Sequence, residues 1–495
     1  MGKTISNYLI DHVKNLNAPA IVCRGRTISF AEFFGFTDKF AAAFNASGIK
    51  KGDVVAICLP NTLEALCALY GLNRIGAIAN VIHPLSPRAQ VDKIIKETSS
   101  EMLLCLPGAG SELVPSYSLG TPVGTERPLS DLLALQSQWT ENRESSPCLY
   151  MHSSGTTGAP KTIVLTDDQV NAIADGMEAH YAGQDIRGLR CLAILPIFHG
   201  YGFATGMHFF LANECCLDLV PSYDRVKTPA YAIGTKANVL FGVPSIYLSM
   251  LASPEFRNAD KSHIKQAYVG GDFVSTDLTE KFNACLAAGG SSAKLCVGYG
   301  LTECVAACAS NSNLEYKLGT IGKPFKNVDI VIMNESGDVL PVNERGEICV
   351  AGTSVMSGYL NDNDATSKAL IADKNGKVWL HTRDVGYFDT DGFLHFLSRT
   401  KRIVKVNGFT VFPSEVENVI LSISGVVSCV VKEGNVKGYP ALIAYVIKKA
   451  PDLTESDVID YCTQHLIKWS CPKQVKFLDA FPLSATGKVD VDKLN

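Results

Sequence analysis

A loop rich in hydroxyls and glycines follows a strand-like run near residue 150. It reads Ser153-Ser154-Gly155-Thr156-Thr157-Gly158-Ala159-Pro160-Lys161. Gly155 and Gly158 permit a left-handed backbone and let N–H groups approach an anion closely. The hydroxyls donate hydrogen bonds and Lys161 supplies a positive charge. These residue types, concentrated in one short segment, indicate a phosphate-binding loop rather than an ordinary surface turn.

The elements around this loop distinguish it from the loop of P-loop NTPases. A Walker loop has the pattern GxxxxGK[ST] and opens directly into a helix. Here Lys161 precedes the strand-like run TIVL, and only then do Thr166 and Gln169 predict the start of a helix. We therefore expect the loop to join two strands, which excludes an ordinary P-loop kinase.

The elements that must position this loop alternate along most of the chain. The apolar run Val54 to Pro60, for example, precedes the helical pattern Thr62 to Leu72. Such alternation predicts a large layered N-terminal domain of α/β subdomains. The expected domain ranges are 1–398 for this part, 399–402 for a hinge and 403–495 for a small mobile α+β C-terminal domain.

The small domain is predicted from short strands and helices after the cationic segment Ser398 to Ile403. That segment is too short for a loose linker and is typical of a hinge. We expect strands at Ile403 to Val406, Val426 to Lys432 and Ala441 to Ile447, and helices at Pro413 to Ser422 and Thr454 to His465.

Composition excludes several classes of protein. The 495 residues are 46% apolar and 19% charged with a formal charge of -4, which argues against disorder, nucleic-acid binding and adhesion to an anionic membrane. The 16 cysteines form no CxxC pair. Even Cys215 with Cys216 and Cys304 with Cys308 are expected to be buried thiols rather than metal or redox ligands. We expect no signal peptide and no membrane span, and hence a cytoplasmic protein.

The loop and six later motifs resemble the adenylate-forming (AMP-binding) superfamily, and acyl-CoA synthetases and 4-coumarate CoA ligases in particular. The resemblance extends in order over nearly the whole chain. The later motifs are LPIFHGYGF (Leu195 to Phe203), GGD (Gly270 to Asp272), GYGLTE (Gly298 to Glu303), GEICVAG (Gly346 to Gly352), TRDVGYFDTDGFLHFLSR (Thr382 to Arg399) and PLSATGK (Pro482 to Lys488).

The resemblance implies that ATP converts a carboxylic acid to an acyl adenylate. Lys488 would bridge the acid and the α-phosphate, Thr302 would bind that phosphate, and Glu303 would hold Mg²⁺. Tyr299 would stack on adenine, Asp384 would accept from the ribose hydroxyls, and Arg399 would add a second ribose or phosphate contact. The implied ATP-binding residues are Ser153, Ser154, Gly155, Thr156, Thr157, Gly158, Lys161, Gly271, Asp272, Tyr299, Thr302, Asp384, Arg399 and Lys488.

The acid and the thiol acceptor are implied in the same way. His199 stands where amino-acid-activating relatives usually have Asp, so a fatty or aromatic acid is expected, with His199 orienting its carboxylate. The implied acid-binding residues are His199, Tyr201, Gly270, Gly271, Val297 and Gly298. After adenylation the small domain would rotate about Lys401 and present a thiol-acceptor face that contains Lys405, Gly408 and Thr410.

Several positions depart from the usual pattern of the superfamily. Thr162 replaces a glycine after the loop lysine, and Asp167 replaces a common histidine. Arg383 stands before Asp384 where glycine is typical, which places a bulky cation beside the ribose site. Thr410 stands where many CoA ligases have Gln or Arg, and it bears on the choice of acceptor.

Three functions follow as hypotheses. The leading one is an ATP- and Mg²⁺-dependent ligase that joins a fatty or aromatic acid to CoA. The second is a stand-alone adenylation enzyme that loads an acyl or aminoacyl group onto the phosphopantetheine of a carrier protein. The third is an inactive relative that binds nucleotide or acid, which the presence of Glu303, Asp384, Arg399 and Lys488 together argues against.

Overall fold

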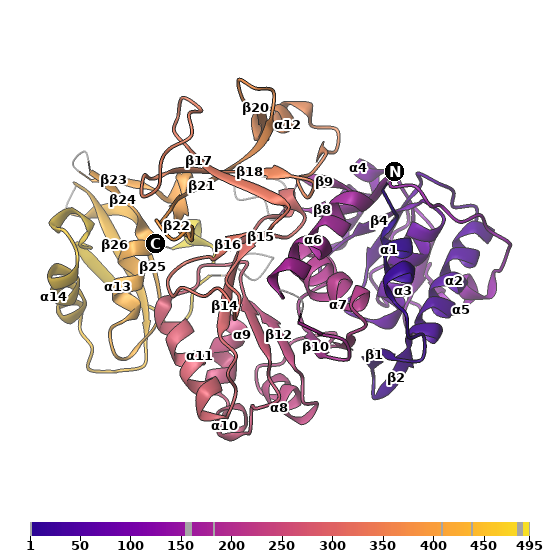
Figure 1. Ribbon diagram of the computed structural model, residues 1–495, viewed down its shortest axis with the longest axis horizontal. Helices are drawn as coiled ribbons and strands as arrows, with labels where there is room; N and C mark the ends of the chain where they lie inside the picture. The colour runs from indigo at the N-terminus through magenta and orange to yellow at the C-terminus, as the bar shows by residue number, and fades with distance from the viewer. Residues whose placement is uncertain are drawn as a thin grey trace.

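The computed structural model describes residues 2–153, 161–181, 184–406, 409–436, 439–482 and 489–494. Among these residues, two large sheets, two smaller antiparallel sheets and one mixed sheet are formed (Figure 1). The expectation of a layered α/β fold followed by a small α+β unit is confirmed. No helix in the described ranges is long and apolar enough to cross a membrane.

The first large sheet has its strands mostly in parallel. Its order is β19 (Gly358–Tyr359), β9 (Thr162–Thr166), β8 (Pro147–His152), β4 (Ile78–Val81), β3 (Val54–Cys58), β5 (Ser100–Cys105), β6 (Ser116–Ser118) and β7 (Arg127–Pro128). All five residues of β3 are buried, as expected for a parallel strand covered on both faces. Only the pairs β8 with β9 and β9 with β19 are antiparallel.

The second large sheet carries the other half of the site. Its order is β16 (Lys323–Pro324), β15 (Ala307–Ser310), β14 (Leu295–Gly300), β13 (Gln266–Val269), β12 (Val239–Gly242), β10 (Arg190–Ala193), β11 (Cys216–Leu219), β1 (Pro19–Cys23) and β2 (Arg26–Ser29). The central strands are parallel, and β14 pairs with β15 in antiparallel fashion.

Some of the helices that accompany these sheets begin at side-chain caps. Ser29 and Glu32 form a capping box, and Thr62 caps the helix that the sequence predicted after Val54 to Pro60. The α-helices of this part are α1 (Ile5–His12), α2 (Phe30–Ala46), α3 (Leu63–Arg74), α4 (Arg88–Thr98), α5 (Leu129–Ala134), α6 (Asp167–His180), α7 (Phe209–Ala212), α8 (Lys227–Gly234), α9 (Pro244–Ala252), α10 (Pro254–Asn258) and α11 (Thr276–Ala288).

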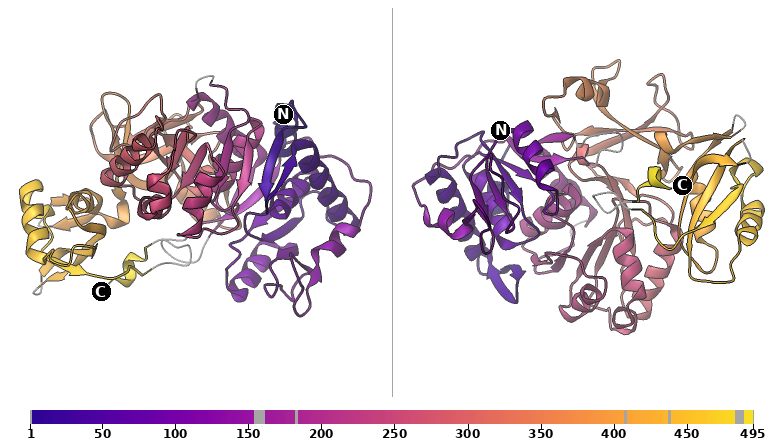
Figure 2. Two further views of the ribbon diagram at one scale, coloured as in Figure 1. Left: turned by 90° about the horizontal axis from the view of Figure 1, so that it is seen from below. Right: turned by 180° about the vertical axis from the view of Figure 1, so that it is seen from behind.

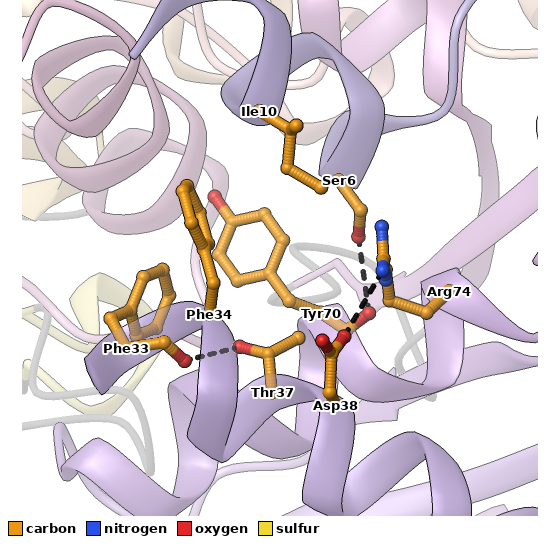
Figure 3. Close-up of a pocket in the computed structure, with 8 residues that line it drawn as sticks. All are labelled: Ser6, Ile10, Phe33, Phe34, Thr37, Asp38, Tyr70 and Arg74. Carbon is orange, nitrogen blue, oxygen red and sulfur yellow. Dashed lines mark hydrogen bonds and ion pairs between the residues drawn. The ribbon is translucent and has the colours of Figure 1, made fainter. Parts of the chain in front are cut away.

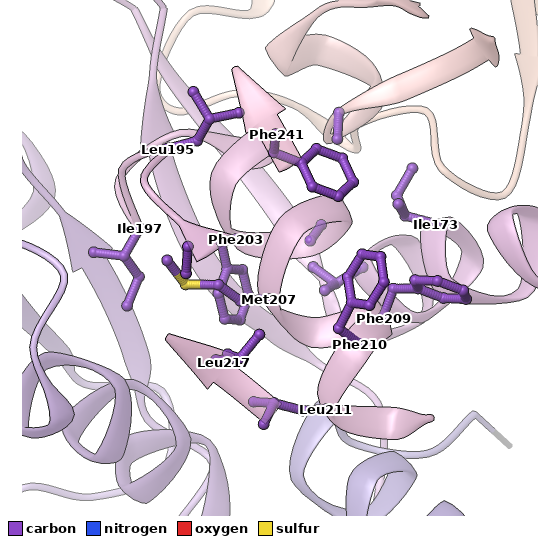
Figure 4. Packing of buried hydrophobic residues seen from close by; sticks show 14 of the residues in the cluster. Ile173, Leu195, Ile197, Phe203, Met207, Phe209, Phe210, Leu211, Leu217 and Phe241 are labelled. Atoms are coloured by element: carbon purple, nitrogen blue, oxygen red, sulfur yellow. The ribbon is translucent and has the colours of Figure 1, made fainter. Parts of the chain in front are cut away.

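One hydrophobic core joins the two large sheets. Val55 and Leu149 of the first sheet and Leu192 and Val239 of the second belong to the same buried cluster. A π-helix, Tyr201–His208, runs into α7 within this cluster, where Phe203 and Phe209 are buried and Phe210 packs edge-on against Phe241 (Figure 4). Such helices are rare and frequently occur at functional sites.

A third, antiparallel sheet follows. It contains β17 (Val328–Met333), β18 (Gly346–Gly352), β21 (Val378–Phe388) and β20 (Leu370–Ala372), and β22 (Leu394–Arg399) pairs with β21. Helix α12 (Asn363–Ala369) precedes β20. This sheet brings the TRDVGYFDTDGFLHFLSR motif to the second large sheet.

The C-terminal residues form their own elements at the end of the molecule opposite the N-terminus (Figures 1 and 2). They are β23 (Val404–Val406), β24 (Phe409–Val411), α13 (Pro413–Leu421), β25 (Val426–Val436), β26 (Tyr439–Lys448), α14 (Glu455–His465) and β27 (Gln474–Phe477), with short 3-10 helices at Lys468–Ser470 and Val491–Lys493. The strands and helices predicted here are confirmed; the largest shift at an end is four residues.

Buried apolar side chains divide at the same place in the chain. The large core ends at Leu394, whereas the clusters around Val431 and Tyr445 contain only residues from Val404 onward. The predicted domain ranges stay predictions, and this division of the core supports them.

All the cysteines are free thiols, and all but Cys285 are buried. A side-chain hydrogen bond with Cys304, together with burial, raises the pKa of the Cys308 thiol. Burial raises the pKa of Cys216 to about 11. The cysteines therefore behave as the small apolar residues that the sequence predicted.

Candidate functional site

The base of the hydroxyl-rich loop is closed by its first and last residues. Strands β8 and β9 pair with His152 opposite Thr162. The backbone N–H of Ser153 donates to the carbonyl of Lys161 over 2.9 Å, and the N–H of Lys161 donates to the Ser153 hydroxyl over 3.1 Å. The loop thus joins two strands, as predicted. Ser154, Gly155, Thr156, Thr157 and Gly158 lie outside the described residues.

A series of buried hydrogen bonds holds His152, the last residue of β8 before the loop. His152 Nε2 lies 2.8 Å from the amide oxygen of Asn80, so this nitrogen donates, and Nδ1 accepts from the Thr162 hydroxyl at 3.2 Å. Burial lowers the pKa of His152 to about 4, so the ring is neutral at physiological pH. Thr162, a departure from glycine, therefore supplies a hydrogen bond to the residue that begins the loop.

The departure at Asp167 also has a structural explanation. Its carboxylate is fully buried at the start of α6 and accepts from the backbone N–H groups of Ile5 and Ser146 and from the Asn73 amide. It ties α1 to the segment before β8 and, through Asn73, to α3. Thr166 and Gln169 form the predicted reciprocal cap, with Thr166 N–H donating to Gln169 Oε1 over 2.7 Å.

Tyr359 contacts both Lys161 and Glu303. The Lys161 Nζ lies 4.7 Å from the centre of the Tyr359 ring and 3.5 Å from Asp362. The Tyr359 hydroxyl donates to Glu303 Oε1 over 2.9 Å. The phosphate-loop lysine and the predicted metal carboxylate, 142 positions apart in the printed sequence, are thus brought to one place. Sequence analysis missed Tyr359, and its only signal was its position soon after the GEICVAG motif.

Glu303 is followed by a strained turn. Val305 has φ 65° and ψ −56°, and the Ala306 N–H donates to the Cys304 carbonyl over 2.7 Å, which defines a γ-turn of the rare, strained kind. A Cβ placed on Gly200 would lie only 1.5 Å from the Val305 carbonyl oxygen. The turn therefore locks the Glu303 segment against the glycine beside His199. Strain of this kind is concentrated at functional sites.

The ribose-binding residues predicted from the sequence form one contact group. The Tyr299 hydroxyl donates to Asp384 Oδ2 over 2.7 Å, and Arg399 Nε lies 3.3 Å from Oδ1. Asp384 is 3% exposed, and burial raises its pKa against the opposing effects of Arg399 and Tyr299. Within the described residues, Oδ1 has no hydrogen-bond partner. A buried carboxylate oxygen in this state fits a hydroxyl donor from a ligand.

The backbone beside Asp384 is held by a second carboxylate. Glu347 Oε1 accepts from the Arg383 N–H over 2.7 Å, and Oε2 lies 2.9 Å from His381 Nδ1. With Cys349, these side chains place three potential metal ligands within 4.8 Å of one another. Both oxygens of Glu347 already accept hydrogen bonds, so the group acts as a support for residue 383. Sequence analysis missed this support because its members come from different strands.

The acid-binding residues gather around the start of the π-helix. His199 Nδ1 accepts from the Tyr201 N–H over 3.2 Å, which leaves the ring proton of neutral His199 on Nε2. A Cβ on Gly270 would meet the Gly298 carbonyl at 2.9 Å and Tyr201 Cε1 at 3.8 Å. Val297 is buried on the same strand as Gly298, and Gly271 has a left-handed φ of 78°. The predicted acid-binding residues therefore lie together.

Two hydroxyls of this π-helix are buried without a partner. In the described part of the chain, neither Tyr201 Oη nor Thr205 Oγ1 makes a hydrogen bond. The Tyr201 ring packs edge-on against Phe241 at 5.5 Å. Sequence analysis named Tyr201 but missed Thr205, which stands four residues later on the same helix.

The predicted hinge residue lies between two anchored neighbours. In the 3-10 helix Thr400–Arg402, the Thr400 hydroxyl donates to the Arg383 carbonyl over 2.9 Å. Arg402 donates to Glu417, which is 2% exposed and also accepts from the Val431 N–H. Lys401 between them is exposed. The backbone at Lys405 pairs with Thr410, whereas Gly408 and Lys488 lie outside the described residues.

A small cavity elsewhere does not belong to this site. It lies among α1, α2 and α3 and has a volume of about 10 Å³, near the minimum for one water molecule (Figure 3). Arg74 on its wall pairs with Asp38 at 3.1 Å, although the Arg74 Nε has no hydrogen-bond partner among the described residues. A substrate does not fit there.

Activation of an acid by a nucleotide is the class of chemistry that this fold and site define. The site combines Lys161 beside the first sheet, Glu303 after β14 of the second sheet and the buried Asp384 of the third. The chain belongs to the AMP-binding enzyme family, because the profile of that family matches residues 12–360. The profile of the AMP-binding enzyme C-terminal domain matches residues 415–488.

Similar proteins of known name agree with this membership. A long-chain-fatty-acid–CoA ligase of Salmonella typhimurium is 28% identical, over 95% of this chain and 90% of its own. A 4-coumarate–CoA ligase 2 of Solanum tuberosum is also 28% identical, over 98% and 92%. The structure of O-succinylbenzoate coenzyme A synthetase from Bacillus subtilis, in complex with ATP and magnesium ion, superposes with a TM-score of 0.83 at 25% identity, over 99% of each chain.

A further solved structure shows the fold alone. ATP-bound MatB from Rhodopseudomonas palustris superposes with a TM-score of 0.88 at 23% identity, over 99% of this chain and 97% of its own.

Proposed function

We propose that the protein is an ATP-dependent acid–thiol ligase. It activates a fatty or aromatic carboxylic acid as the acyl adenylate, with release of pyrophosphate, and then transfers the acyl group to the thiol of CoA. Family membership and the named CoA ligases support this proposal over nearly the whole chain. The observation that carries it is the buried Asp384 carboxylate, whose Oδ1 is ion-paired with Arg399 but accepts no hydrogen bond from the described residues.

The nucleotide is held by residues from three sheets. Asp384 accepts from the ribose hydroxyls, with Tyr299 fixing its other oxygen and Arg399 balancing its charge. The loop from Ser153 to Lys161 binds the phosphates, and Thr302 contacts the α-phosphate. The remaining proposed nucleotide contacts are Gly271, Asp272 and, from the small domain, Lys488.

Glu303 is the carboxylate that would hold Mg²⁺. A hard cation prefers carboxylate oxygen and retains several waters, which a half-buried side chain at the edge of the site allows. When bound, the ion neutralises phosphate charge. Tyr359 donates to Oε1 of Glu303 and so fixes the orientation of the carboxylate toward the phosphate-loop lysine.

The acid lies against His199, Tyr201, Gly270, Gly271, Val297 and Gly298. His199, whose Nδ1 accepts from the Tyr201 N–H, orients the substrate carboxylate. The buried hydroxyls of Tyr201 and Thr205, unpaired within the described residues, favour an aromatic acid with a polar substituent over a plain fatty chain. A buried hydroxyl without a partner is costly, and a substrate oxygen or N–H would satisfy it.

The small domain turns about Lys401 between the two half-reactions. Thr400 is tied to Arg383 of the large domain, while Arg402 is tied to Glu417 of the small domain. The backbone between these anchors is that of Lys401, so rotation is confined to this residue. Rotation withdraws Lys488 and presents the face at Lys405, Gly408 and Thr410 to the thiol. We propose domain ranges of 1–398, 399–402 and 403–495, and a cytoplasmic location.

A panel of acids tests the function. Fatty acids, aromatic acids and hydroxylated aromatic acids are incubated with ATP and Mg²⁺, and pyrophosphate, AMP and acyl-CoA are measured with and without CoA. We expect AMP and pyrophosphate with the hydroxylated aromatic acids. Formation of ADP and phosphate in place of AMP would refute acid activation through an adenylate.

The second candidate function is transfer to a carrier protein rather than to CoA. Thr410, on the proposed acceptor face, is the feature that favours it, because many CoA ligases have Gln or Arg there. Acylation of a phosphopantetheinylated carrier, with no acyl-CoA from free CoA, would establish this alternative.

A further inference from the structure

Arg383 occupies the middle of an irregularity in strand β21. Cys349 of β18 pairs with His381, and Glu347 pairs with Val385, so three residues of β21 stand opposite one of β18. Arg383 is the central residue of the three and has a left-handed φ of 61°. Bulges next to binding sites redirect a side chain. Here the bulge places an exposed arginine directly before the buried Asp384.

The backbone of Arg383 is fixed on both sides. Its N–H donates to Glu347 over 2.7 Å, and its carbonyl accepts from the Thr400 hydroxyl over 2.9 Å. An L-residue with positive φ is strained, and glycine would adopt this conformation without strain. Arg383 therefore places a charged side chain at a position where the backbone would accept glycine without strain.

Arg383 is close in the fold to the segment that carries Glu303. Its chain neighbour Asp384 accepts from the Tyr299 hydroxyl, and Tyr299 stands four residues before Glu303. The Tyr359 hydroxyl in turn donates to Glu303 Oε1. Among the described residues, the Arg383 guanidinium forms no ion pair that would neutralise it.

We propose that Arg383 binds the triphosphate of ATP. The proposal rests on the proposed function and adds a nucleotide contact to it. A guanidinium is planar and binds phosphate through two parallel hydrogen bonds, which an exposed arginine directly before the ribose carboxylate is placed to do. Lys161 Nζ lies over the ring of Tyr359, so the triphosphate would lie between the cations of Arg383 and Lys161.

The test compares Arg383→Gly with a matched control. Arg24→Gly changes another exposed arginine with a left-handed φ, of 52°, in the turn between β1 and β2. Glycine fits both backbones, so neither variant should fail to fold. Binding of MgATP and of adenosine is measured by calorimetry on the full chain, and the Michaelis constant for CoA is measured with saturating ATP and acid. Arg383→Lys is the charge-conserving variant.

The expected result separates a phosphate contact from a disturbed ribose site. Arg383→Gly should weaken MgATP binding by about tenfold or more, as for a lost charge-assisted hydrogen bond, and leave adenosine binding unchanged. Arg383→Lys should recover part of the affinity, and Arg24→Gly should bind both ligands as the natural protein does.

Three outcomes would overturn the proposal. Equal weakening of MgATP and adenosine would mean that Arg383 only shapes the Asp384 site. A change confined to the Michaelis constant for CoA would assign the phosphate contact to CoA. Unchanged MgATP binding would remove the contact altogether. Natural protein that binds MgATP but activates no acid would refute the proposed function instead, and the Arg383 comparison would remain readable.

Discussion

The Tyr299 hydroxyl lies 2.7 Å from Asp384 Oδ2, and this hydrogen bond holds a carboxylate that is 3% exposed. The two residues come from different sheets, β14 and β21. Their contact therefore fixes the third sheet to β14 of the second, while Oδ1, which is ion-paired with Arg399, accepts no hydrogen bond from the described residues.

Replacing Asp384 by Asn should weaken ATP binding and change the pH dependence of stability. Burial raises the pKa of Asp384 above its ordinary value of 3.8, so the folded state binds this proton more tightly than the unfolded state does. Its contribution to the free energy of unfolding is full below pH 3.8 and is lost as pH rises through the raised pKa. The stability of Asp384→Asn relative to the natural protein should therefore increase over that interval.

The measurement combines urea unfolding across pH with ATP titrations. At neutral pH the Michaelis constant for ATP should rise by about tenfold or more in Asp384→Asn, because the amide replaces a charged acceptor. A relative stability that stays flat with pH would contradict the assignment of a raised pKa to Asp384.

Lys488→Ala should abolish formation of the adenylate and largely spare the second half-reaction. Loss of a preorganised cation at the reacting phosphate costs about 100-fold to 1,000-fold in rate. Pyrophosphate release with acid and ATP measures the first half-reaction, and acyl-CoA from a preformed adenylate measures the second. Lys493→Ala, which removes an exposed lysine that pairs with Asp490, is the control and should leave both rates unchanged. Equal loss of both rates in Lys488→Ala would contradict the proposal that the small domain takes a different orientation for each half-reaction.

Arg402→Ala should destabilise the protein strongly. Glu417 is 2% exposed, and without Arg402 its charge would be buried alone, at a cost of about 3 to 5 kcal/mol in the free energy of unfolding. Burial already raises the pKa of Glu417 while Arg402 opposes that rise, so the variant should recover stability as pH falls and Glu417 takes up a proton.

Arg345→Ala is the matched control for that variant. Arg345 pairs with Glu415 at 3.0 Å, but both side chains are nearly half exposed, so its loss should cost less than about 1 kcal/mol. Urea unfolding measures both variants. Similar losses for Arg402→Ala and Arg345→Ala would mean that the Glu417 pair is no tighter than a surface pair.

Lys261→Met should destabilise the large domain without changing catalysis. Lys261 is fully buried, and its Nζ donates to the carbonyls of Phe256, Arg257 and Ala259 at the end of α10. Methionine fills a similar volume but leaves these acceptors without a donor, at a cost of about 2 to 4 kcal/mol. Lys265→Met, which removes an exposed lysine, should cost less than about 0.5 kcal/mol. A changed Michaelis constant for ATP in Lys261→Met would contradict a purely structural role.

Local patterns predicted the elements well because their causes are local. The wholly apolar run at Val54, the cap at Thr62 and the reciprocal cap at Thr166 each determine nearby backbone through a few neighbours. The order of strand, hydroxyl-rich loop and strand was likewise readable, because the residues after Lys161 are β-branched and apolar.

The parts of the site that depend on distant pairings were not predicted. Tyr359 lies in β19, which pairs with β9 of the first sheet, whereas Glu303 follows β14 of the second sheet. The two residues meet only through this pairing of strands that are distant in the sequence. Glu347 reaches Arg383 across two strands whose register is irregular. The γ-turn at Val305 contradicts the usual preference of a β-branched residue, so the surrounding packing must impose it.

Directed evolution of a different acid preference would meet unequal freedom around the π-helix. The Val305 carbonyl of the strained turn lies directly against Gly200. A Cβ on Gly202 would lie 2.1 Å from the Pro196 carbonyl, so neither glycine has room for a side chain. Gly298 has more room, since its Cβ would first meet the Ser310 hydroxyl at 3.4 Å. Libraries that vary Gly298, Tyr201 and Thr205 should therefore retain foldable enzymes, whereas randomising Gly200 or Gly202 would fill a screen with inactive clones.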